Sequence, residues 1–328
     1  MEQTKLGLIG LGYIGKVHLM NCLKLQNAQL EAVADISKRA LNMAKRAGVP
    51  KTYKDYHELL NDKNVNAVII ALPNHLHLSC VKDAAEAKKH ILLEKPLARN
   101  VKEGEEMVFS AKKNDIKLMV GYPTRFALPF INLRDRIMSG ELGEIQLAVA
   151  DNMGAGPLLH RAESDAPSPV PEWWFNSELT GGGALIDLGC HMISLLRWYF
   201  GEATDAKAYL GHRYNLPHED HAVCTIKFEQ GQVAILNVGW FSQQSQAKIE
   251  VLGTMGHATS AHAPPSKVKT AIQLMLKRTP DFYLPYLAEI QHFVNSIQKN
   301  RQPNPSGEDA LKDLEVIQKA YQNEIRLV

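Results

Sequence analysis

The hydrophobic pattern of the first 120 residues alternates between short apolar runs and longer stretches of helical character. The apolar runs lie at residues 5–9, 30–34, 65–72, 91–93 and 117–120. Their nearly continuous apolar character predicts strands that are buried on both faces. Helical stretches lie between them at residues 16–25, 76–87 and 101–113, with a further helix expected from Ser37. Strand–helix alternation of this kind predicts an α/β domain, a doubly wound parallel sheet of the Rossmann type.

The pattern changes after residue 122. A short helix is expected at 133–138 and a strand at 145–151, and Pro123 and Pro129 are expected to break regular structure. Residues 184–200 read as a helix that is apolar on nearly every side and therefore buried. Strands at 206–209, 222–229, 232–240 and 248–252 have no helical crossovers between them, with Gly231 at a tight hairpin. They predict an open, mostly antiparallel sheet, followed by closing helices at 286–300 and 310–326.

These elements predict two domains. Residues 1–122 form the dinucleotide-binding Rossmann domain, and residues 123–328 form an α+β domain for substrate binding and oligomerisation. The C-terminal helix is a candidate to pack back on the first domain.

Composition narrows the class of protein. The 328 residues are 45% hydrophobic and 22% charged, and the net charge of +2 gives no basic surface for nucleic acid or an anionic membrane. No apolar run approaches the ~20 residues of a membrane span, and the N-terminus has no room for a secretory signal. Four scattered cysteines without metal spacing indicate a reduced, cytoplasmic protein.

The first candidate site is the glycine-rich sequence that joins the first strand to the first helix. Its residues are Gly10, Leu11, Gly12, Tyr13, Ile14 and Gly15. A G-x-G-x-x-G sequence alone is a weak signal, but between a strand and a helix it has a mechanism. The first glycine allows the tight turn, the second admits a pyrophosphate and the third lets the helix pack on the strand. The helix N-terminus then offers free N–H groups to the phosphates.

Asp35 ends the second strand, where an acid can accept hydrogen bonds from the adenosine ribose and repel a 2′-phosphate. NAD is therefore the expected coenzyme, with NADP possible because Lys38 and Arg39 follow closely and offset part of that repulsion. The alternative role for Asp35 is to cap the helix that starts at Ser37.

Two more clusters follow predicted strands, at the sheet edge where ligands bind in this fold. One contains Pro73, Asn74 and His77, and the other is Glu94-Lys95-Pro96. Pro96 favours an extended Lys95, which would present the lysine at the edge of the sheet. A lone lysine before proline is more often a solvated surface residue.

The third candidate is the segment G-G-G-A-L-I-D-L-G-C-H at residues 181–191. Three successive glycines allow close backbone approach or a turn without a Cβ clash. Asp187 and His191 lie four residues apart and share a helix face, where they can orient each other and move a proton. A buried pair that only satisfies its own hydrogen bonds is an equal alternative.

Taken together, these motifs resemble the glucose–fructose oxidoreductase and inositol dehydrogenase family (Gfo/Idh/MocA). The resemblance rests on G-L-G-Y-I-G, A-D-I-S at the second strand, P-N-H-L-H, E-K-P and the 181–191 segment. It implies a nicotinamide-dependent oxidoreductase that acts on a sugar, polyol or nucleotide sugar, with Lys95, Asp187 and His191 as the catalytic group. Some relatives carry tyrosine at the position of His191.

The same resemblance implies that the segment 121–126 passes the cofactor, so Tyr122 and Arg125 are candidates to line the site. Arg125 is equally a candidate for a structural ion pair. Residues 154–174 are too irregular for a helix or strand and could cap the site, where Trp173 and Trp174 offer flat surfaces for a sugar ring. Tryptophans are more often packing residues. His218-Glu219-Asp220-His221 lacks a further set of ligands with useful spacing and is expected to cap a strand, so no metal is expected.

These residues favour hydride transfer between a carbinol carbon and nicotinamide C4. His191 is expected to act as general acid/base, Asp187 to orient it and Lys95 to steady the alkoxide or share the base role. Two alternatives remain open from sequence. One is a glycosidase that uses bound NAD for transient oxidation, and the other is a non-catalytic dinucleotide or sugar sensor. The second domain's sheet is the surface expected for subunit contact in a homo-oligomer.

Overall fold

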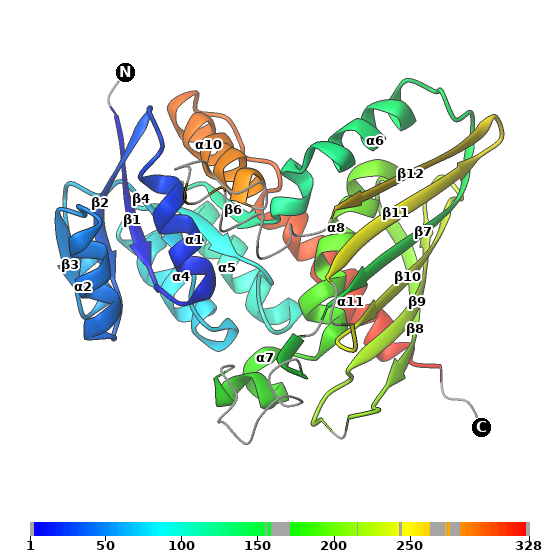
Figure 1. Ribbon diagram of the computed structural model, residues 1–328, viewed down its shortest axis with the longest axis horizontal. Coiled ribbons are helices and arrows are strands. Elements are labelled where there is room, and N and C mark those ends of the chain that lie inside the picture. Colours follow the sequence, from blue (N-terminus) through cyan, green and yellow to red (C-terminus); the bar gives the residue numbers. More distant parts are fainter. Residues whose placement is uncertain are drawn as a thin grey trace. The chain divides into compact units, whose positions relative to one another are not determined.

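The computed structural model in Figure 1 describes residues 3–154, 156–158, 171–214, 216–242, 245–262, 273, 275 and 283–325. The chain divides into two compact units. Unit 1 contains Met1–Ala98, Lys102–Pro123 and Tyr283–Leu311, and unit 2 contains Arg99–Val101, Thr124–Phe282 and Lys312–Val328. The expected 123–328 domain therefore lacks Tyr283–Leu311, which lies in unit 1.

Unit 1 is built on a six-stranded parallel sheet with the order β3-β2-β1-β4-β5-β6. The strands are β1 (Thr4–Ile9), β2 (Ala28–Ala34), β3 (Lys51–Tyr53), β4 (Ala67–Ile70), β5 (His90–Glu94) and β6 (Leu118–Gly121). Strands β4 and β6 are buried along their whole length, as their apolar sequences predict. The order 3-2-1-4-5-6 reverses between β1 and β4, which is the Rossmann arrangement. The predicted doubly wound parallel sheet is confirmed.

Helices cover this sheet. They are α1 (Tyr13–Cys22), α2 (Lys38–Arg46), α3 (Tyr56–Leu60), α4 (His77–Glu86), α5 (Val101–Lys113) and α10 (Leu284–Gln298), with a 3₁₀ turn η1 (Asn74–Leu76) before α4. Helix α10 comes from the C-terminal part of the sequence and packs beside α1 (Figure 1). Strand β3 and helix α3 were not expected, because three and five residues are too few for a clear period.

Unit 2 contains the second sheet, with the order β12-β11-β7-β10-β9-β8. Its strands are β7 (Ile145–Met153), β8 (Ala203–Gly211), β9 (His221–Phe228), β10 (Val233–Gly239), β11 (Gln246–Gly253) and β12 (Gly256–His262). Only the β7–β10 pair is parallel, so the predicted mostly antiparallel sheet is confirmed. Alternate residues of β9 are buried and exposed, so helices cover one face of the sheet and leave the other open.

Three successive helical elements precede β8. They are α7 (Ser177–Thr180), the π-helical turn η5 (Leu185–Gly189) and α8 (Cys190–Phe200). The turn η5 contacts β7 and β10 of the sheet, and α8 contacts β7. Helix α11 (Gly307–Gln322) begins in unit 1 and ends in unit 2. Ser177–Phe200 is long and apolar enough to cross a membrane, contrary to the expectation from sequence. Its most apolar stretch is 67% buried within the protein, as in a core helix.

Two further expectations need correction. Pro129 does not break regular structure, because it occupies the first turn of α6 (Leu128–Met138). The N–H groups of a first turn have no partner within the helix, so the N–H that proline lacks is not needed there. Pro123 opens the 3₁₀ turn η2 (Pro123–Phe126). Strand β12 was not predicted, because its residues are small or polar and show no apolar alternation. Most of residues 154–174 lies outside the described part of the chain. All four cysteines lie in the described part of the chain, where they are buried and form no disulfide bond.

Candidate active site

The glycine-rich loop in unit 1 follows the geometry that its sequence predicts. Gly10 has a φ of +93°, and a Cβ there would overlap the carbonyl oxygen of Ala71. A Cβ on Gly15 would overlap the carbonyl oxygen of Gly10, whereas a Cβ on Gly12 would meet nothing within 4 Å. Gly10 and Gly15 therefore serve the packing of the turn and of α1. Gly12, the N-cap residue of α1, has open space beside it.

The N-terminus of α1 is suited to an anion. The N-cap makes no side-chain hydrogen bond, and the first turn holds no acidic residue. Tyr13 is exposed and Ile14 is partly exposed on the same turn. Free N–H groups and the positive end of the helix dipole favour a phosphate at such a place. These features fit the pyrophosphate of a dinucleotide.

Asp35 links this loop to the end of β2. One carboxyl oxygen, Oδ2, accepts the backbone N–H of Leu11 at 2.6 Å, and Oδ1 accepts that of Ser37 at 2.7 Å. Ser37 itself is the N-cap of α2, since its hydroxyl accepts the N–H of Ala40. Asp35 is therefore not the cap and remains at the strand tip, where a ribose would lie. Lys38 and Arg39 are exposed beside it.

His77 does not face a ligand. Its ring is fully buried, with Nε2 2.9 Å from the carbonyl oxygen of Leu72 and Nδ1 3.0 Å from that of Pro96. Burial lowers the pKa of this imidazole. We therefore correct its expected cofactor contact to a positioning role, in which it ties the segment after β4 to the segment after β5. Pro73 and Asn74, just before α4, are partly exposed.

Glu94 and Lys95 end β5, and their roles differ. The Glu94 side chain is buried, with Oε1 2.6 Å from Nε2 of His18, and Oε2 accepts the backbone N–H of Lys95 at 3.3 Å. Through these contacts the Glu94 side chain points into the interior of unit 1. This corrects the expectation that this side chain contacts the cofactor. Lys95 is half-buried, and the Lys95–Pro96 peptide bond is cis.

Tyr122 and Arg125 lie in different units. Tyr122 ends unit 1 in a fully buried position, so its side chain is not placed to line an open substrate site. Arg125 donates to the carbonyl oxygen of Ser194 at 2.7 Å, and its guanidinium lies 5.7 Å from the centre of the Trp198 ring. These contacts favour the structural alternative for Arg125 within unit 2.

The three glycines of the 181–191 segment let the backbone approach the protein itself. Gly181 has a φ of +87° and ends α7, and a Cβ there would lie 2.6 Å from the backbone of Arg99. A Cβ on Gly183 would overlap the carbonyl oxygen of Glu219. The Glu219 carboxyl group accepts the N–H groups of Gly183 and Leu185 and the hydroxyl of Tyr321, at 2.7–3.1 Å. The segment is therefore held at its start from several sides.

Asp187 lies in the π-helical turn that follows. π-turns within helices often occur at functional sites. The indole Nε1 of Trp240 donates to Asp187 Oδ2 at 3.1 Å, and Asn152 donates to the carbonyl oxygen of Leu188 at 2.9 Å. Asp187 and His191 are both partly exposed, while most residues around them in the segment are buried. Sequence reasoning did not identify Trp240 or Asn152, whose partners are distant along the chain.

Aromatic side chains lie next to this carboxylate. The ring centres of Trp240 and Trp174 are 6.3 Å apart, and those of Trp174 and Trp173 are 5.6 Å apart. His218 packs edge-on against Trp240 and bonds through Nε2 to the carbonyl oxygen of Trp174 at 2.8 Å. Trp173 and Trp174 are partly exposed in the 3₁₀ turn η4 (Glu172–Phe175). We call Trp173, Trp174 and Trp240 the aromatic wall.

The segment 218–221 makes contacts within unit 2, and the expectation that it binds no metal stays a prediction. Glu219 holds the glycine segment, and Asp220 accepts the N–H of Tyr214 at 2.7 Å and lies 2.6 Å from Nδ1 of His221, the first residue of β9.

Of the three residues expected to be catalytic, Asp187 and His191 share one helical segment of unit 2. Lys95 belongs to unit 1.

Comparison with known proteins gives the family of both parts of the chain. Residues 4–122 match the family model described as "Oxidoreductase family, NAD-binding Rossmann fold", and residues 130–259 match the "GFO/IDH/MocA C-terminal domain". The chain is 28% identical to the myo-inositol 2-dehydrogenase of Thermotoga maritima, over 93% of this chain and 91% of that protein. It is 27% identical to the scyllo-inositol 2-dehydrogenase (NAD(+)) of Bacillus subtilis, over 96% and 92%. A solved structure of a probable dehydrogenase from Thermotoga maritima superposes with a TM-score of 0.83 at 26% identity, over 98% of this chain and 96% of that one.

Proposed function

The chain belongs to the Gfo/Idh/MocA oxidoreductase family, and we propose that this NAD-dependent dehydrogenase oxidises a secondary alcohol on the ring of a cyclic polyol or sugar. The two relatives named as inositol 2-dehydrogenases support this substrate class. The comparisons give no support to an NAD-dependent glycosidase or a non-catalytic sensor.

One observation carries the choice of substrate. Asp187 is partly exposed, and its hydrogen-bond partner Trp240 is buried, so Trp173 and Trp174 are the partly exposed members of the aromatic wall. A saturated ring presents C–H groups that pack on an aromatic face and hydroxyl groups that bond to a carboxylate. A polyol ring satisfies both surfaces at once.

The residues of the chain divide the chemistry between them. Gly12 and the N-terminus of α1 would hold the pyrophosphate of NAD, and Asp35 would bond its adenosine ribose. Bound NAD supplies the hydride acceptor. His191 would accept the hydroxyl proton of the substrate, because an imidazole titrates near ~6.5 and can both take and release a proton. Asp187 would orient that imidazole.

Lys95 would stabilise the negative charge that develops on the substrate oxygen. An ammonium group aimed at an alkoxide is worth most where water is excluded. The kinetics of Lys95 variants test this role.

A substrate screen tests the proposed function. Purified protein and NAD would be mixed at alkaline pH with myo-inositol, scyllo-inositol, glucose, a nucleotide sugar or the open-chain polyol sorbitol. We expect reduced cofactor to accumulate with one or more of the cyclic compounds and not with sorbitol. Asp187→Asn is the matched control, because it keeps the shape and removes the charge. Preference for the open chain, or product without net reduced cofactor, would contradict the proposal.

We also propose that the open face of the second sheet joins subunits. Tyr209 and Val223 are paired across β8 and β9, and both are more than a third exposed, as are Val233 and Leu252 on the same sheet. Apolar groups on an open sheet face favour burial against a second copy. Light scattering after size exclusion would measure the mass, and Val223→Lys should shift it toward the monomer. A wild-type monomer would contradict the proposal.

A further inference from the structure

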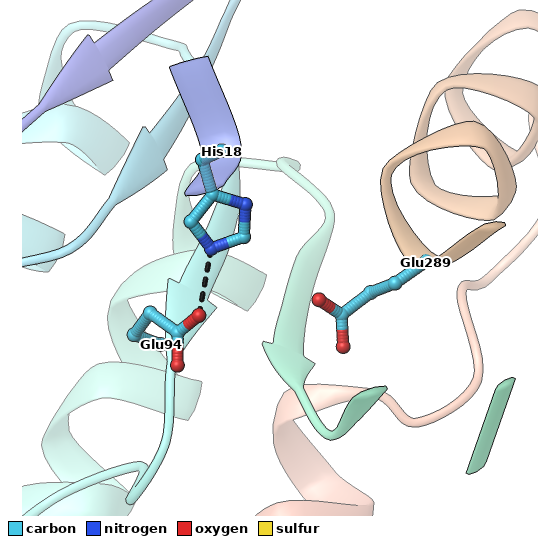
Figure 2. Close-up of side chains that lie close together, drawn as sticks. All are labelled: His18, Glu94 and Glu289. Carbon is cyan, nitrogen blue, oxygen red and sulfur yellow. Dashed lines mark hydrogen bonds and ion pairs between the residues drawn. The ribbon is translucent and has the colours of Figure 1, made fainter. Parts of the chain in front are cut away.

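Three ionisable side chains from distant parts of the sequence meet inside unit 1. His18 lies on α1, Glu94 ends β5 and Glu289 lies on α10. One ring nitrogen of His18 and one carboxyl oxygen of each glutamate lie within 4.8 Å of one another. Figure 2 shows Glu289 pointing toward the His18–Glu94 hydrogen bond. His18 and Glu289 are 0% exposed and Glu94 is 7% exposed. Two carboxyl groups and one imidazole therefore share a space that water does not reach.

Such a group cannot hold two bare negative charges. Removing an isolated carboxylate from water carries a large free-energy penalty, so a buried acid binds a cation or keeps its proton. No side-chain donor among the described residues bonds to the carboxyl oxygens of Glu289. Burial raises the pKa of Glu289 well above its ordinary value, and the charge of Glu94 raises it further, whereas the backbone N–H of Tyr122 opposes the shift.

The geometry favours a proton over a metal ion. Nε2 of His18 and Oε1 of Glu94 are 2.6 Å apart, which is a hydrogen-bond distance. Two ligands that each lie about 2.1 Å from one zinc ion at tetrahedral angles are separated by more than about 3 Å. A metal ion would require Nε2 of His18 and Oε1 of Glu94 to move apart, whereas a shared proton is compatible with their observed distance.

We propose that His18, Glu94 and Glu289 form a buried proton-holding site that positions Lys95, with Glu289 neutral in the folded protein. Glu94 is the link, because Oε1 contacts His18 while Oε2 accepts the backbone N–H of Lys95. A neutral Glu289 leaves Glu94 as the one carboxylate of the group, without a second charge to push it away from Lys95. The catalytic meaning of this positioning rests on the function proposed for Lys95.

The groups around the site do not change this balance. Tyr286 of α10 packs edge-on against the His18 ring at 5.8 Å, and burial raises the pKa of its hydroxyl group. Tyr13 of α1 and Tyr283 also face the Tyr286 hydroxyl, and the pKa of Tyr13 is raised by burial. His77 of α4 senses the charge of Glu94, but burial lowers its pKa. Burial therefore favours the neutral forms of Tyr286, Tyr13 and His77.

The first test is the dependence of unfolding on pH, which does not involve catalysis. The folded pKa of Glu289 lies above the unfolded value near ~4.3, so its contribution to stability is full below that value and declines as the pH rises toward the folded pKa. Across this window one such group lowers the folding equilibrium constant by about tenfold per pH unit. Glu289→Gln keeps the shape without the titration, so its stability should fall less steeply between pH 5 and pH 9. Glu103→Gln, at another buried glutamate of unit 1, should keep the wild-type slope.

The second test separates the two glutamates by activity. Glu94→Gln should lower kcat by roughly 10- to 100-fold with a much smaller change in the KM for NAD, because a misplaced catalytic group slows turnover. Glu289→Gln should lower kcat by less than about threefold, since an amide replaces an acid that was already neutral. Lys95→Ala is the reference, and normal turnover in that variant would overturn the function proposed for Lys95 and leave the unfolding test intact. An unchanged pH slope in Glu289→Gln would overturn the proton-holding site. A second result would also overturn the proton-holding site. It is an equal loss of kcat in Glu94→Gln and Glu289→Gln, together with zinc that copurifies with the wild-type protein and is measured by elemental analysis.

Discussion

The indole N–H of Trp240 donates to Oδ2 of Asp187 at 3.1 Å, across 53 residues of sequence. Trp240 follows directly after β10 and is itself fixed, because its backbone N–H donates to the carbonyl oxygen of Asp220 at 2.9 Å. An indole can only donate, so this bond engages Asp187 as an acceptor and fixes the plane of its carboxyl group. The sheet of unit 2 thereby orients the acid that lies one helical turn before His191.

Loss of this bond should affect turnover more than folding. Trp240→Phe keeps an aromatic ring in the wall and removes the N–H group. We expect kcat to fall by about tenfold or more, because a carboxylate that rotates no longer orients its partner. Trp198→Phe, also in unit 2, is the control and should turn over normally. Steady-state rates and thermal unfolding of both variants measure the difference. Equal rates in the two would show that Trp240 serves packing alone.

Asp35 should make NAD the preferred coenzyme. Its carboxyl group is held at the tip of β2 by the N–H groups of Leu11 and Ser37, where a 2′-phosphate would meet a like charge. Asp35→Asn removes the charge and leaves Lys38 and Arg39 exposed nearby, so NADP should gain at least about tenfold in affinity relative to NAD.

Fluorescence titration gives both dissociation constants. Asp55→Asn is a matched control, because Asp55 caps α3 by the same kind of bond, to the N–H of His57 at 2.9 Å. It should leave the coenzyme ratio unchanged. Equal or tighter NADP binding by the wild type would refute the assignment of Asp35.

The sequence predicts this fold well wherever the signal is local. Helix α5 begins and ends at the predicted residues, and Gly10 and Gly15 have the turn and packing roles that their spacing predicts. Both signals reside in a few consecutive residues. The contact of Gly12 with a pyrophosphate stays a prediction. Pro129 was misread because the same proline that breaks a helix interior fits its first turn, and only the position of the helix start decides between them.

What the sequence could not provide is the partner of each polar side chain. Trp240 reads as a core residue at the end of a strand, and His77 reads as a ligand because it lies at the sheet edge. Glu289 lies on a helix that joins unit 1 from the far end of the chain. In each case the role depends on which groups from elsewhere in the chain come close in space, and no periodicity encodes that contact.

The ion pairs of unit 2 should differ in value according to burial. Arg197 and Asp313 lie 2.6 Å apart with side chains 5% and 0% exposed, whereas Arg136 and Glu141 lie 2.6 Å apart at 42% and 52%. Asp313→Ala should lower the free energy of unfolding by about 3 kcal/mol or more, because Arg197 stays buried with fewer partners. Glu141→Ala should lower it far less, because solvent screens an exposed ion pair. Denaturant titration measures both, and equal losses would contradict the argument from burial.

Lys95, Asp187 and His191 should act as one unit in turnover. Positioned acid/base groups contribute about 10²–10⁴-fold, so Lys95→Ala and His191→Ala should each lose that much in kcat. The double variant should lose little more than either single one, since groups that serve the same proton transfer are strongly non-additive.

Coenzyme affinity should change far less in these variants, because the pyrophosphate is expected at the loop from Gly10 to Gly15. Asp187→Asn separates charge from shape and should fall between wild type and His191→Ala. Rates and melting temperatures measured on the same proteins decide the matter. A His191→Ala protein that melts early yet turns over normally would mean that Asp187 and His191 form a structural pair, and the catalytic assignment would then be wrong.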